Sequence, residues 1–263
     1  MQNNPRTFGG SWLQKSQVGP LHLYLLGERC RFYPDPVRRR CSLLGKDLVL
    51  RRIKQKLLSR FSITDMGDVS LVLGMGVTRD REKATVTITQ ETYTKSLLEL
   101  YGMASCNSTY TPGLGKGPSI DHLEERLLSK EEKQRFQAIT GSVMYLGQVS
   151  RYDIMYAANQ LARAIAKPFK ARMAATKHLL RYLAGTVDFA ITCKKGGFKL
   201  MAFSGANWSN NQDNGKSMSL YIVFVSNASV SLKVGLQGLT AQSTMEAKAG
   251  GRRASDEGSG GLL

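Results

Sequence analysis

The chain has 263 residues, of which 42% are hydrophobic and 22% charged, so it can bury a sizeable core and is neither a disordered chain nor a membrane bundle. Lys and Arg outnumber Asp and Glu by 37 to 20, which gives a formal net charge of +17. Residues 1–60 alone contain 13 basic and 3 acidic side chains. Such a surplus favours polyanionic partners, usually nucleic acid, and a solvated basic segment explains it equally well.

The sequence has no recognisable signal for a membrane or for secretion. No stretch approaches the roughly 20 consecutive apolar residues of a spanning helix, and the first residues are polar. The four cysteines lie far apart without a C-x-x-C pair, which favours free thiols in a reducing compartment over a zinc site or a disulfide framework. We therefore expect an intracellular chain, cytoplasmic or nuclear, without a membrane partner.

The first half of the chain predicts two helices and a hairpin after an irregular beginning. Residues 1–45 mix Gly, Pro and Arg with short apolar pieces and have no sustained period, so we expect no stable structure there. Helical and period-two patterns then predict a helix, two strands around a charged turn and a second helix, at residues 47–61, 69–77, 85–89 and 91–101. Residues 104–128 are rich in Gly and Pro and are expected to form a linker.

The second half predicts helices followed by strands. Ser129 and Glu132 form a capping-box pattern before a helix whose apolar face is Phe136, Ile139, Val143 and Leu146. The further elements expected are two helices and four strands, at residues 154–166, 171–183, 187–193, 199–204, 219–226 and 229–234. A last helix begins at Ser243 and is expected to end after about two turns, because two glycines follow.

Short motifs follow one another in a characteristic order along the chain. They include the runs Phe61–Asp68, Arg79–Lys83, Gly141–Leu146, Arg151–Ile154, His178–Thr186, Ala202–Trp208 and Ala241–Ala247. In this order they resemble the C-terminal reverse transcriptase region, the connection and the ribonuclease H-like region of copia-type LTR retrotransposon Pol polyproteins. The resemblance covers about residues 43–249.

The resemblance implies a fold and a division of the chain. The fold is α+β, with reverse transcriptase thumb- and connection-like helices and a hairpin plus a truncated ribonuclease H-like mixed sheet. The implied parts are a disordered or frameshifted basic segment (1–45), the reverse transcriptase C-terminal region (46–103), the linker (104–128), the connection helices (129–186), the truncated ribonuclease H-like region (187–249) and a disordered tail (250–263).

The resemblance also implies two-metal chemistry, in which carboxylates hold Mg²⁺ ions about 4 Å apart. In intact family members a polymerase Asp-Asp pair precedes the segment that resembles residues 43–47. Here that slot falls on about Val37 to Arg40, so Arg39 and Arg40 stand where carboxylates are needed. Arginine cannot coordinate a cation, and we expect no polymerase activity.

The ribonuclease H slots are also depleted. Gly205 stands in the slot of the first catalytic Asp, and Asn207 in the second position of the same motif, which carries an acidic or amide side chain. Glu246 remains in the slot of the second catalytic carboxylate, at the start of a helix, where the helix dipole alone would also favour it. One carboxylate does not make a two-metal site. We therefore expect Glu246 to be vestigial, no cofactor to be bound and no hybrid to be cleaved.

Basic residues in the second half would contact the phosphates of RNA, DNA or a hybrid without sequence preference. These residues are Lys167, Lys170, Lys177, Arg181, Lys194, Lys195 and Lys199. A solvated surface explains them nearly as well. Three readings stay open: an inactive fragment of a reverse transcriptase/ribonuclease H polyprotein, a non-catalytic nucleic-acid-binding module, and an element-derived relic with no function.

Overall fold

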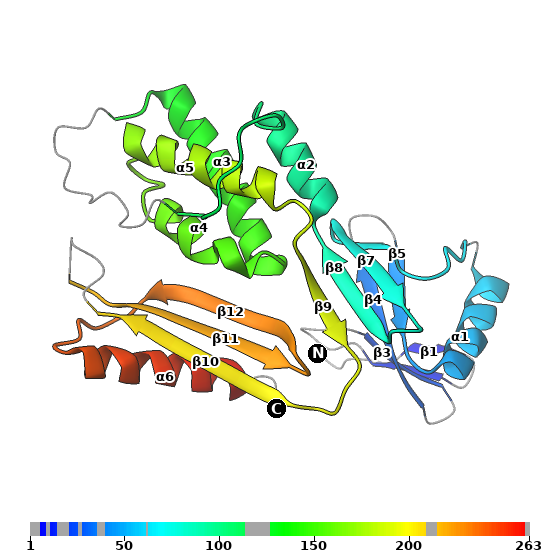
Figure 1. The fold of residues 1–263 in the computed structure, drawn as a ribbon. Coiled ribbons are helices and arrows are strands. Elements are labelled where there is room, and N and C mark those ends of the chain that lie inside the picture. The colour runs from blue at the N-terminus through cyan, green and yellow to red at the C-terminus, as the bar shows by residue number, and fades with distance from the viewer. Residues whose placement is uncertain are drawn as a thin grey trace. The chain divides into compact units, whose positions relative to one another are not determined.

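The computed structural model describes residues 6–8, 11–14, 21–25, 28–35, 40–61, 63–113, 127–208 and 215–260. It contains helices and antiparallel sheets, so the α+β prediction is confirmed (Figure 1). The chain divides into two compact units, Met1–Val69 and Ser70–Leu263. Within the described ranges, no helix has the length and apolar character needed to span a bilayer.

The first unit contains an antiparallel sheet and one helix. Its strands are neighbours in chain order: β1 (Arg6–Phe8), β2 (Ser11–Gln14), β3 (Leu21–Leu25), β4 (Glu28–Asp35) and β5 (Arg40–Leu44). The helix α1 (Asp47–Arg60) forms where the helical pattern predicts it. Ile53 on α1 is buried against Leu43, Val49, Leu50 and Leu57, which form a small core of their own.

The expectation of no stable structure over residues 1–45 differs from the structure, which has five strands in the described parts of that segment. Leu21, Leu23 and Leu25 alternate with other residues at period two, and Leu21 and Leu23 pair with Phe32 and Cys30 of the next strand. Gly, Pro and Arg residues separate the short strands and obscure this pattern in the sequence. Each strand is shorter than the windows in which a period is easily recognised.

The second unit contains a helical bundle and two antiparallel sheets. The four-stranded sheet has the order β6 (Leu71–Val72), β7 (Met75–Asp80), β8 (Thr85–Thr89) and β9 (Ala190–Lys194). The three-stranded sheet has the order β10 (Leu200–Asn207), β11 (Met218–Val225) and β12 (Ala228–Leu236). The helices are α2 (Glu91–Leu100), α3 (Lys130–Val149), the 3₁₀ turn η1 (Tyr152–Ile154), α4 (Met155–Ala162), α5 (Lys170–Gly185) and α6 (Thr244–Gly260).

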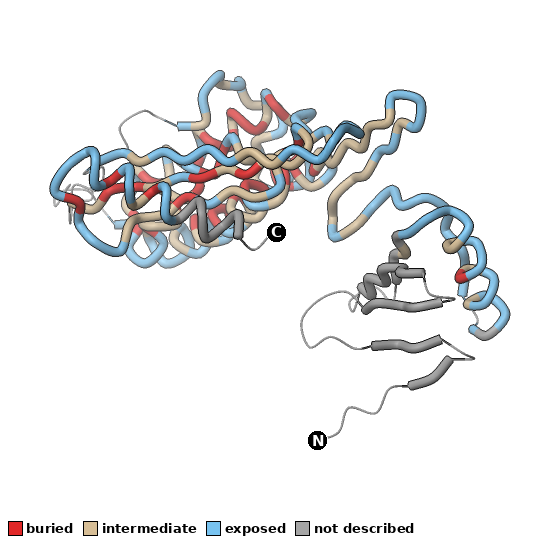
Figure 2. The backbone as a smooth tube through the Cα atoms, turned by 90° about the horizontal axis from the view of Figure 1, so that it is seen from below, coloured by how far each residue is buried: buried red, intermediate tan, exposed pale blue. Residues whose placement is uncertain are grey.

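The bundle α2–α5 contains the main hydrophobic core, and Figure 2 shows how densely its buried residues gather there. The predicted apolar face of α3 is confirmed, since Phe136, Ile139, Val143 and Leu146 are all buried. The predicted capping box is also present: Ser129 Oγ accepts from the Glu132 N–H at 3.3 Å, and the Glu132 carboxylate accepts from the Ser129 N–H at 3.0 Å. The capping box therefore sets where this helix begins, and the apolar face sets which side of it is buried.

The strand β9 pairs with the hairpin rather than with the strands that follow it. Its register with β8 runs from Thr89 opposite Ala190 to Thr85 opposite Lys194. The hydroxyls of Thr87 and Thr192 are 3.2 Å apart across the two strands. The first strand of the expected ribonuclease H-like region (187–249) therefore belongs to the other sheet. This pairing joins residues that are about 100 apart in the chain, which local patterns do not reveal.

The helix α6 continues through Gly250 and Gly251, where the sequence analysis expected it to end. A Cβ at Gly251 would lie 3.3 Å from the carbonyl oxygen of Gly205, and one at Gly250 would lie 3.0 Å from Gln237 Nε2. The two glycines allow α6 to approach the sheet closely. The loss of helix propensity, about 1 kcal/mol for each glycine, is thus offset by packing that the sequence alone does not show.

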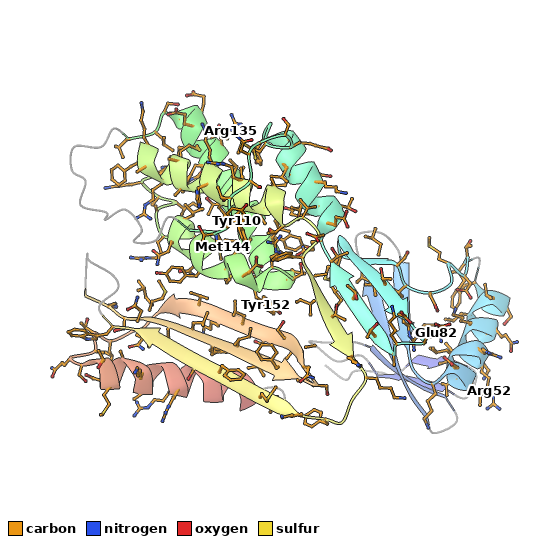
Figure 3. The ribbon with its side chains drawn as sticks, viewed as in Figure 1. Arg52, Glu82, Tyr110, Arg135, Met144 and Tyr152 are labelled. Carbon is orange, nitrogen blue, oxygen red and sulfur yellow. The ribbon has the colours of Figure 1, made fainter. Side chains whose placement is uncertain are left out.

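The two faces of the three-stranded sheet are covered by different helices. The helix α6 lies along β10 and β11 on one face (Figure 1). On the other face, Met218 and Val234 form a small cluster with Met155 of α4, against which Met144 of α3 packs. Figure 3 shows Met144 and Tyr152 on this side of the bundle. The sheet is therefore a layer between α6 and the bundle.

Candidate functional site

Gly205 and Asn207 lie near the end of β10, opposite Leu220 and Met218 of β11. Residues directly opposite one another in an antiparallel pair point to the same face of the sheet. Met218 belongs to the cluster that faces the bundle, so the slots at 205 and 207 belong to the bundle face. An added Cβ at Gly205 would have no atom within 4 Å, so the position has room for a side chain.

Glu246 lies in the first turn of α6 and serves its N-terminus. Its carboxylate accepts a hydrogen bond from the Gln242 N–H at 2.7 Å, and its own N–H donates to Ser243 Oγ at 3.2 Å. A carboxylate and a hydroxyl thus both accept from N–H groups at the start of the helix, although the carboxylate takes the N–H of Gln242 rather than that of Ser243, as a full capping box would. The arrangement agrees with the alternative reading of Glu246 as a helix N-terminal carboxylate.

A cavity of about 460 Å³ lies beside Glu246, between α6 and the sheet. Ser219, Tyr221, Lys233 and Gly235 line it from the strands. These strand residues alternate with those that face the bundle, so they belong to the α6 face. Glu246 therefore lies on the opposite side of the sheet from the direction in which a side chain at 205 would point. The structure does not bring the two ribonuclease H slots together.

The polymerase slot lies largely outside the described residues, which exclude Val37, Arg38 and Arg39. Arg40 is the first residue of β5 and pairs with Asp35 of β4. Within the described ranges, no group of three or more His, Cys, Asp or Glu side chains is placed to hold a metal ion.

The predicted phosphate-contacting residues fall into two groups in the second unit. Lys167, Lys170, Lys177 and Arg181 lie on or just before α5. Lys194, Lys195 and Lys199 lie at the end of β9 and in the connection to β10. The six lysines are exposed, but Arg181 is partly buried, and its Nε donates to the Asn107 carbonyl oxygen at 2.6 Å. Arg181 therefore has a structural role in holding residues 103–113.

The expected linker lies in part against α5. Besides Arg181, His178 Nε2 is 3.0 Å from the carbonyl oxygen of Thr111, and a Cβ at Gly185 would be only 2.7 Å from Ser108 Cβ. Residues 104–113 are thus a packed connection, whereas the linker prediction for 114–126 lies outside the described residues. The composition of the segment predicted a loop but gave no sign of this docking.

A buried polar network centred on Arg151 lies within the described residues, and no site was predicted there from the sequence. Arg151 is 2% exposed and binds Asp153 through two hydrogen bonds, Nε to Oδ1 at 3.0 Å and Nη2 to Oδ2 at 2.7 Å. It also donates to the carbonyl oxygen and the hydroxyl of Thr186, at 2.8 and 2.6 Å. In the sequence, Arg151 and Asp153 counted only as part of the run Arg151–Ile154, one of the motifs of the resemblance. The signal for the network in the sequence was the pair of opposite charges, Arg151 and Asp153, next to the apolar face of a helix.

Two aromatic residues complete this network. The guanidinium carbon of Arg151 lies 5.7 Å from the ring centre of Tyr182 and 5.2 Å from that of Phe189. The Tyr182 hydroxyl donates to Asp153 at 2.9 Å. Burial raises the pKa of Tyr182, and its hydrogen bond to the Asp153 carboxylate raises it further. The network joins η1 to the end of α5 and satisfies the buried charge, as a desolvated ion needs.

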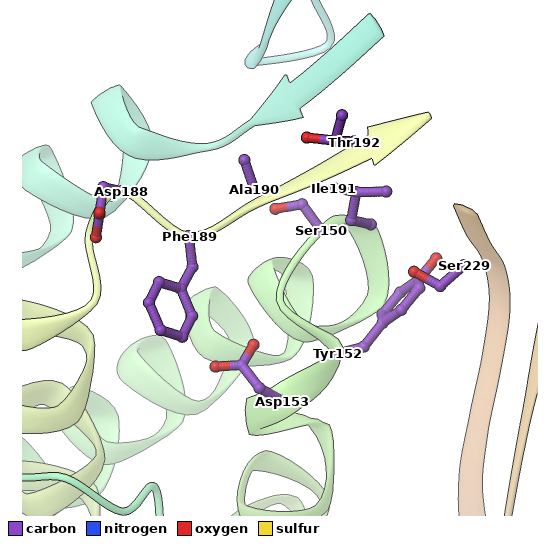
Figure 4. A pocket seen from close by; sticks show the side chains of 9 residues that line it. All are labelled: Ser150, Tyr152, Asp153, Asp188, Phe189, Ala190, Ile191, Thr192 and Ser229. Atoms are coloured by element: carbon purple, nitrogen blue, oxygen red, sulfur yellow. The ribbon is translucent and has the colours of Figure 1, made fainter. Parts of the chain in front are cut away.

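A shallow cavity of about 480 Å³ lies next to the network (Figure 4). Asp153, Asp188 and Phe189 line one side of it, and Tyr152 and Ser229 the other. Burial raises the pKa of Tyr152. Since Asp153 is already bound by Arg151 and Tyr182, the cavity offers no pair of free carboxylates for two-metal chemistry.

No protein-family model matches the chain, and no solved structure matches it. The retrovirus-related Pol polyprotein from transposon RE2 of Arabidopsis thaliana is 32% identical over 209 residues, which are 78% of this chain and 14% of that protein. The corresponding polyprotein from transposon TNT 1-94 of Nicotiana tabacum is 29% identical over 212 residues, 78% of this chain and 16% of that protein. The chain thus spans about a seventh of the length of these polyproteins.

A shorter relative covers much of the same region. An uncharacterized mitochondrial protein of Arabidopsis thaliana is 25% identical over 183 residues, which are 69% of this chain and 73% of that protein. The resemblance drawn from the sequence motifs is confirmed by the transposon relatives. The chain is a fragment-length homologue of the Pol polyproteins of copia-type retrotransposons.

Proposed function

We propose that this chain is a catalytically inactive form of the reverse transcriptase/ribonuclease H segment of a copia-type Pol polyprotein. The observation that supports this most directly is the placement of the two ribonuclease H slots. Gly205 has no side chain, and Glu246 lies on the other side of the sheet with its carboxylate bound to the Gln242 N–H. Hybrid cleavage needs several carboxylates that converge on two cations.

The test is cleavage of an RNA–DNA hybrid by the purified chain with Mg²⁺ or Mn²⁺, together with a primer-extension assay. We expect neither activity. Gly205→Asp should not restore cleavage, because the new carboxylate would project away from Glu246. Cleavage by the unmodified chain that disappears in Glu246→Gln would refute the proposal, since Gln preserves the size of the side chain and removes only its charge.

A second candidate is non-catalytic binding of nucleic acid. It is favoured by the exposed Lys194, Lys195 and Lys199, which lie close together in sequence at one end of β9. Phosphate contacts release counterions, so affinity should fall steeply as salt rises. Filter binding of single-stranded RNA, duplex DNA and a hybrid at two salt concentrations tests this.

Charge-removing variants localise the binding. Exchange of these three lysines for Gln should weaken binding of all three nucleic acids alike and reduce the salt dependence. Exchange of Lys130, Lys133 and Lys248 for Gln removes the same charge on α3 and α6, elsewhere in the second unit, and is the matched control. Equal loss in both triple variants would show that only the net charge acts. Salt-independent binding would contradict the candidate altogether.

The third reading, an element-derived relic with no function, predicts a chain that folds poorly. The dense core of the bundle argues for cooperative folding. A urea titration followed by fluorescence and circular dichroism distinguishes the two. One sigmoidal transition of the second unit would count against the relic reading, whereas gradual loss of signal would favour it.

A further inference from the structure

The strand β10 has one unpaired edge. Among the strands that the structure describes, its only neighbour is β11, which lies between β10 and β12. An unpaired edge presents backbone N–H and C=O groups that another strand can bind, and proteins commonly protect it with a charged side chain. The opposite edge, β12, has the exposed Lys233 in its middle. The eight residues of β10 contain no charged side chain.

On one face of β10, an exposed aromatic side chain lies next to a position that has no side chain. Phe203 is 58% exposed and is held by an edge-to-face contact with Phe224, with ring centres 5.9 Å apart at an angle of 87°. Two residues further along the same face is Gly205, with no atom within 4 Å of a Cβ built there. Along this edge, the phenyl ring of Phe203 is therefore followed by an open space at Gly205.

Neither covering layer blocks this part of the strand. The helix α6 packs on the other face, where Gly251 lies near Ala206 and Ser219. On the face of Phe203 and Gly205, the bundle contacts the sheet through Met218 and Val234 of the two other strands. The edge of β10 is thus accessible over the described part of the second unit.

Two copies of β10 fit one another in an antiparallel register. In a pair related by a twofold axis at Ser204, residue 203 of each copy lies opposite residue 205 of the other. Each Phe203 ring would then cover the Gly205 of the second copy, an arrangement in which an aromatic residue shields a cross-strand glycine. The same register places the Ser204 residues of the two copies opposite one another. The eight residues of each strand bring no like charges together, although the whole chain is strongly basic.

We propose that the free edge of β10 is a self-association surface, which pairs antiparallel with β10 of a second copy through Phe203 and Gly205. Pairing of one strand buries less than the roughly 1,200 Å² that stable interfaces reach, so the dimer is weak and depends on concentration. It does not depend on whether the chain cleaves nucleic acid. Gly205, which stands in the slot of the first catalytic Asp, also matters for the association, because an Asp at 205 would place a charge on the edge of the strand.

Sedimentation velocity of the full chain over two decades of concentration tests the proposal, at moderate salt so that the net charge is screened. We expect a reversible monomer–dimer equilibrium. Gly205→Asp and Phe203→Ser should each weaken it by about tenfold or more, equivalent to about 1.4 kcal/mol. Gly235→Asp is the matched control, because Gly235 lies in the other edge strand with open space at its Cβ. This control should dimerise like the unmodified chain.

A covalent test of the same pairing does not depend on the stability of these variants. In the Ser204→Cys variant, the thiol of one copy lies opposite the same thiol of the second copy across the twofold axis. Mild oxidation should therefore produce a disulfide-linked dimer. The unmodified chain, with its four cysteines, should not produce that dimer under the same conditions. A chain that stays monomeric, equal loss of association in Gly205→Asp and Gly235→Asp, or no cross-link at 204 would each overturn the proposal.

Discussion

The helical bundle and the three-stranded sheet differ in how their key residues are used. In the bundle, each of the three guanidinium nitrogens of Arg151 donates a hydrogen bond, and the core side chains around it are almost fully buried. In the sheet, Gly205 contributes no side chain, and Glu246 is engaged in holding a helix end. Packing and chemistry are thus carried by separate residues. The core of the bundle therefore does not depend on the residues at positions 205 and 246.

The largest effect is expected from the bundle core. Phe136→Ala removes a fully buried ring and should lower the free energy of unfolding by about 3–5 kcal/mol, the sum of lost burial and the cavity left behind. Phe198→Ala, at a position that is 74% exposed next to β10, should change it by less than about 0.5 kcal/mol. Urea denaturation measures both. Similar losses at the two positions would remove the distinction between bundle and sheet.

Next comes the buried ion pair. Arg151→Met removes the cation bound to Asp153 and a hydrogen bond to the Thr186 carbonyl, and should destabilise the second unit by about 3 kcal/mol. The value is at the lower end for buried pairs because the Asp153 side chain is 30% exposed. Lys130→Met, an exposed residue of α3, is the control and should change the free energy of unfolding little. A loss below about 1 kcal/mol for Arg151→Met would show that the network contributes little to stability.

A smaller effect is expected at the start of α6. Ser243→Ala removes the hydroxyl that accepts from the Glu246 N–H and should destabilise by about 1 kcal/mol. Glu246→Gln keeps an oxygen for the Gln242 N–H and should have about half that effect, through the lost charge near the helix N-terminus. Thermal unfolding compares the two. A stabilising effect of Glu246→Gln would contradict the capping role and would indicate unrelieved charge at this residue.

The smallest effect concerns pH. The folded-state pKa of Tyr182 is raised by burial and by the hydrogen bond to Asp153, so folding favours its neutral form. Its contribution is fully present below the unfolded pKa of about 10 and is lost as pH rises through the folded value. The unmodified protein should therefore lose more stability than Tyr182→Phe above about pH 10. Equal slopes in urea titrations at pH 9 and above would argue against this linkage.

Local signals predicted the parts of the fold that local interactions define. The Ser129–Glu132 pair and the spacing of Phe136, Ile139 and Val143 gave α3 its start and its buried face, because both are set within one helix. The strand β8 followed in the same way from its alternating threonines, whereas the expected strand 69–77 is divided into β6 and β7, and Arg79 and Asp80 of the expected turn belong to β7. Homology to the polyproteins was likewise readable, since it rests on the order of motifs.

Long-range packing decided what the sequence could not predict. Strand β9 looked like the beginning of a new sheet, yet it completes the hairpin. Gly250 and Gly251 looked like a helix end, yet their lack of side chains lets α6 approach the strands. The two catalytic slots could be assigned by motif, but their placement on opposite faces depends on the alternation of β10 against β11.

The pairing of β8 with β9 also has a consequence for how the chain folds. The two strands enclose the whole bundle, from α2 to α5, between them. Their contact closes a loop of about 100 residues, and the entropy lost in closing it is recovered only when the strands meet. During synthesis the pairing of β8 with β9 must therefore wait until residue 194 has emerged. We expect the bundle to form first and bring its two ends together, so that the sheet is added late.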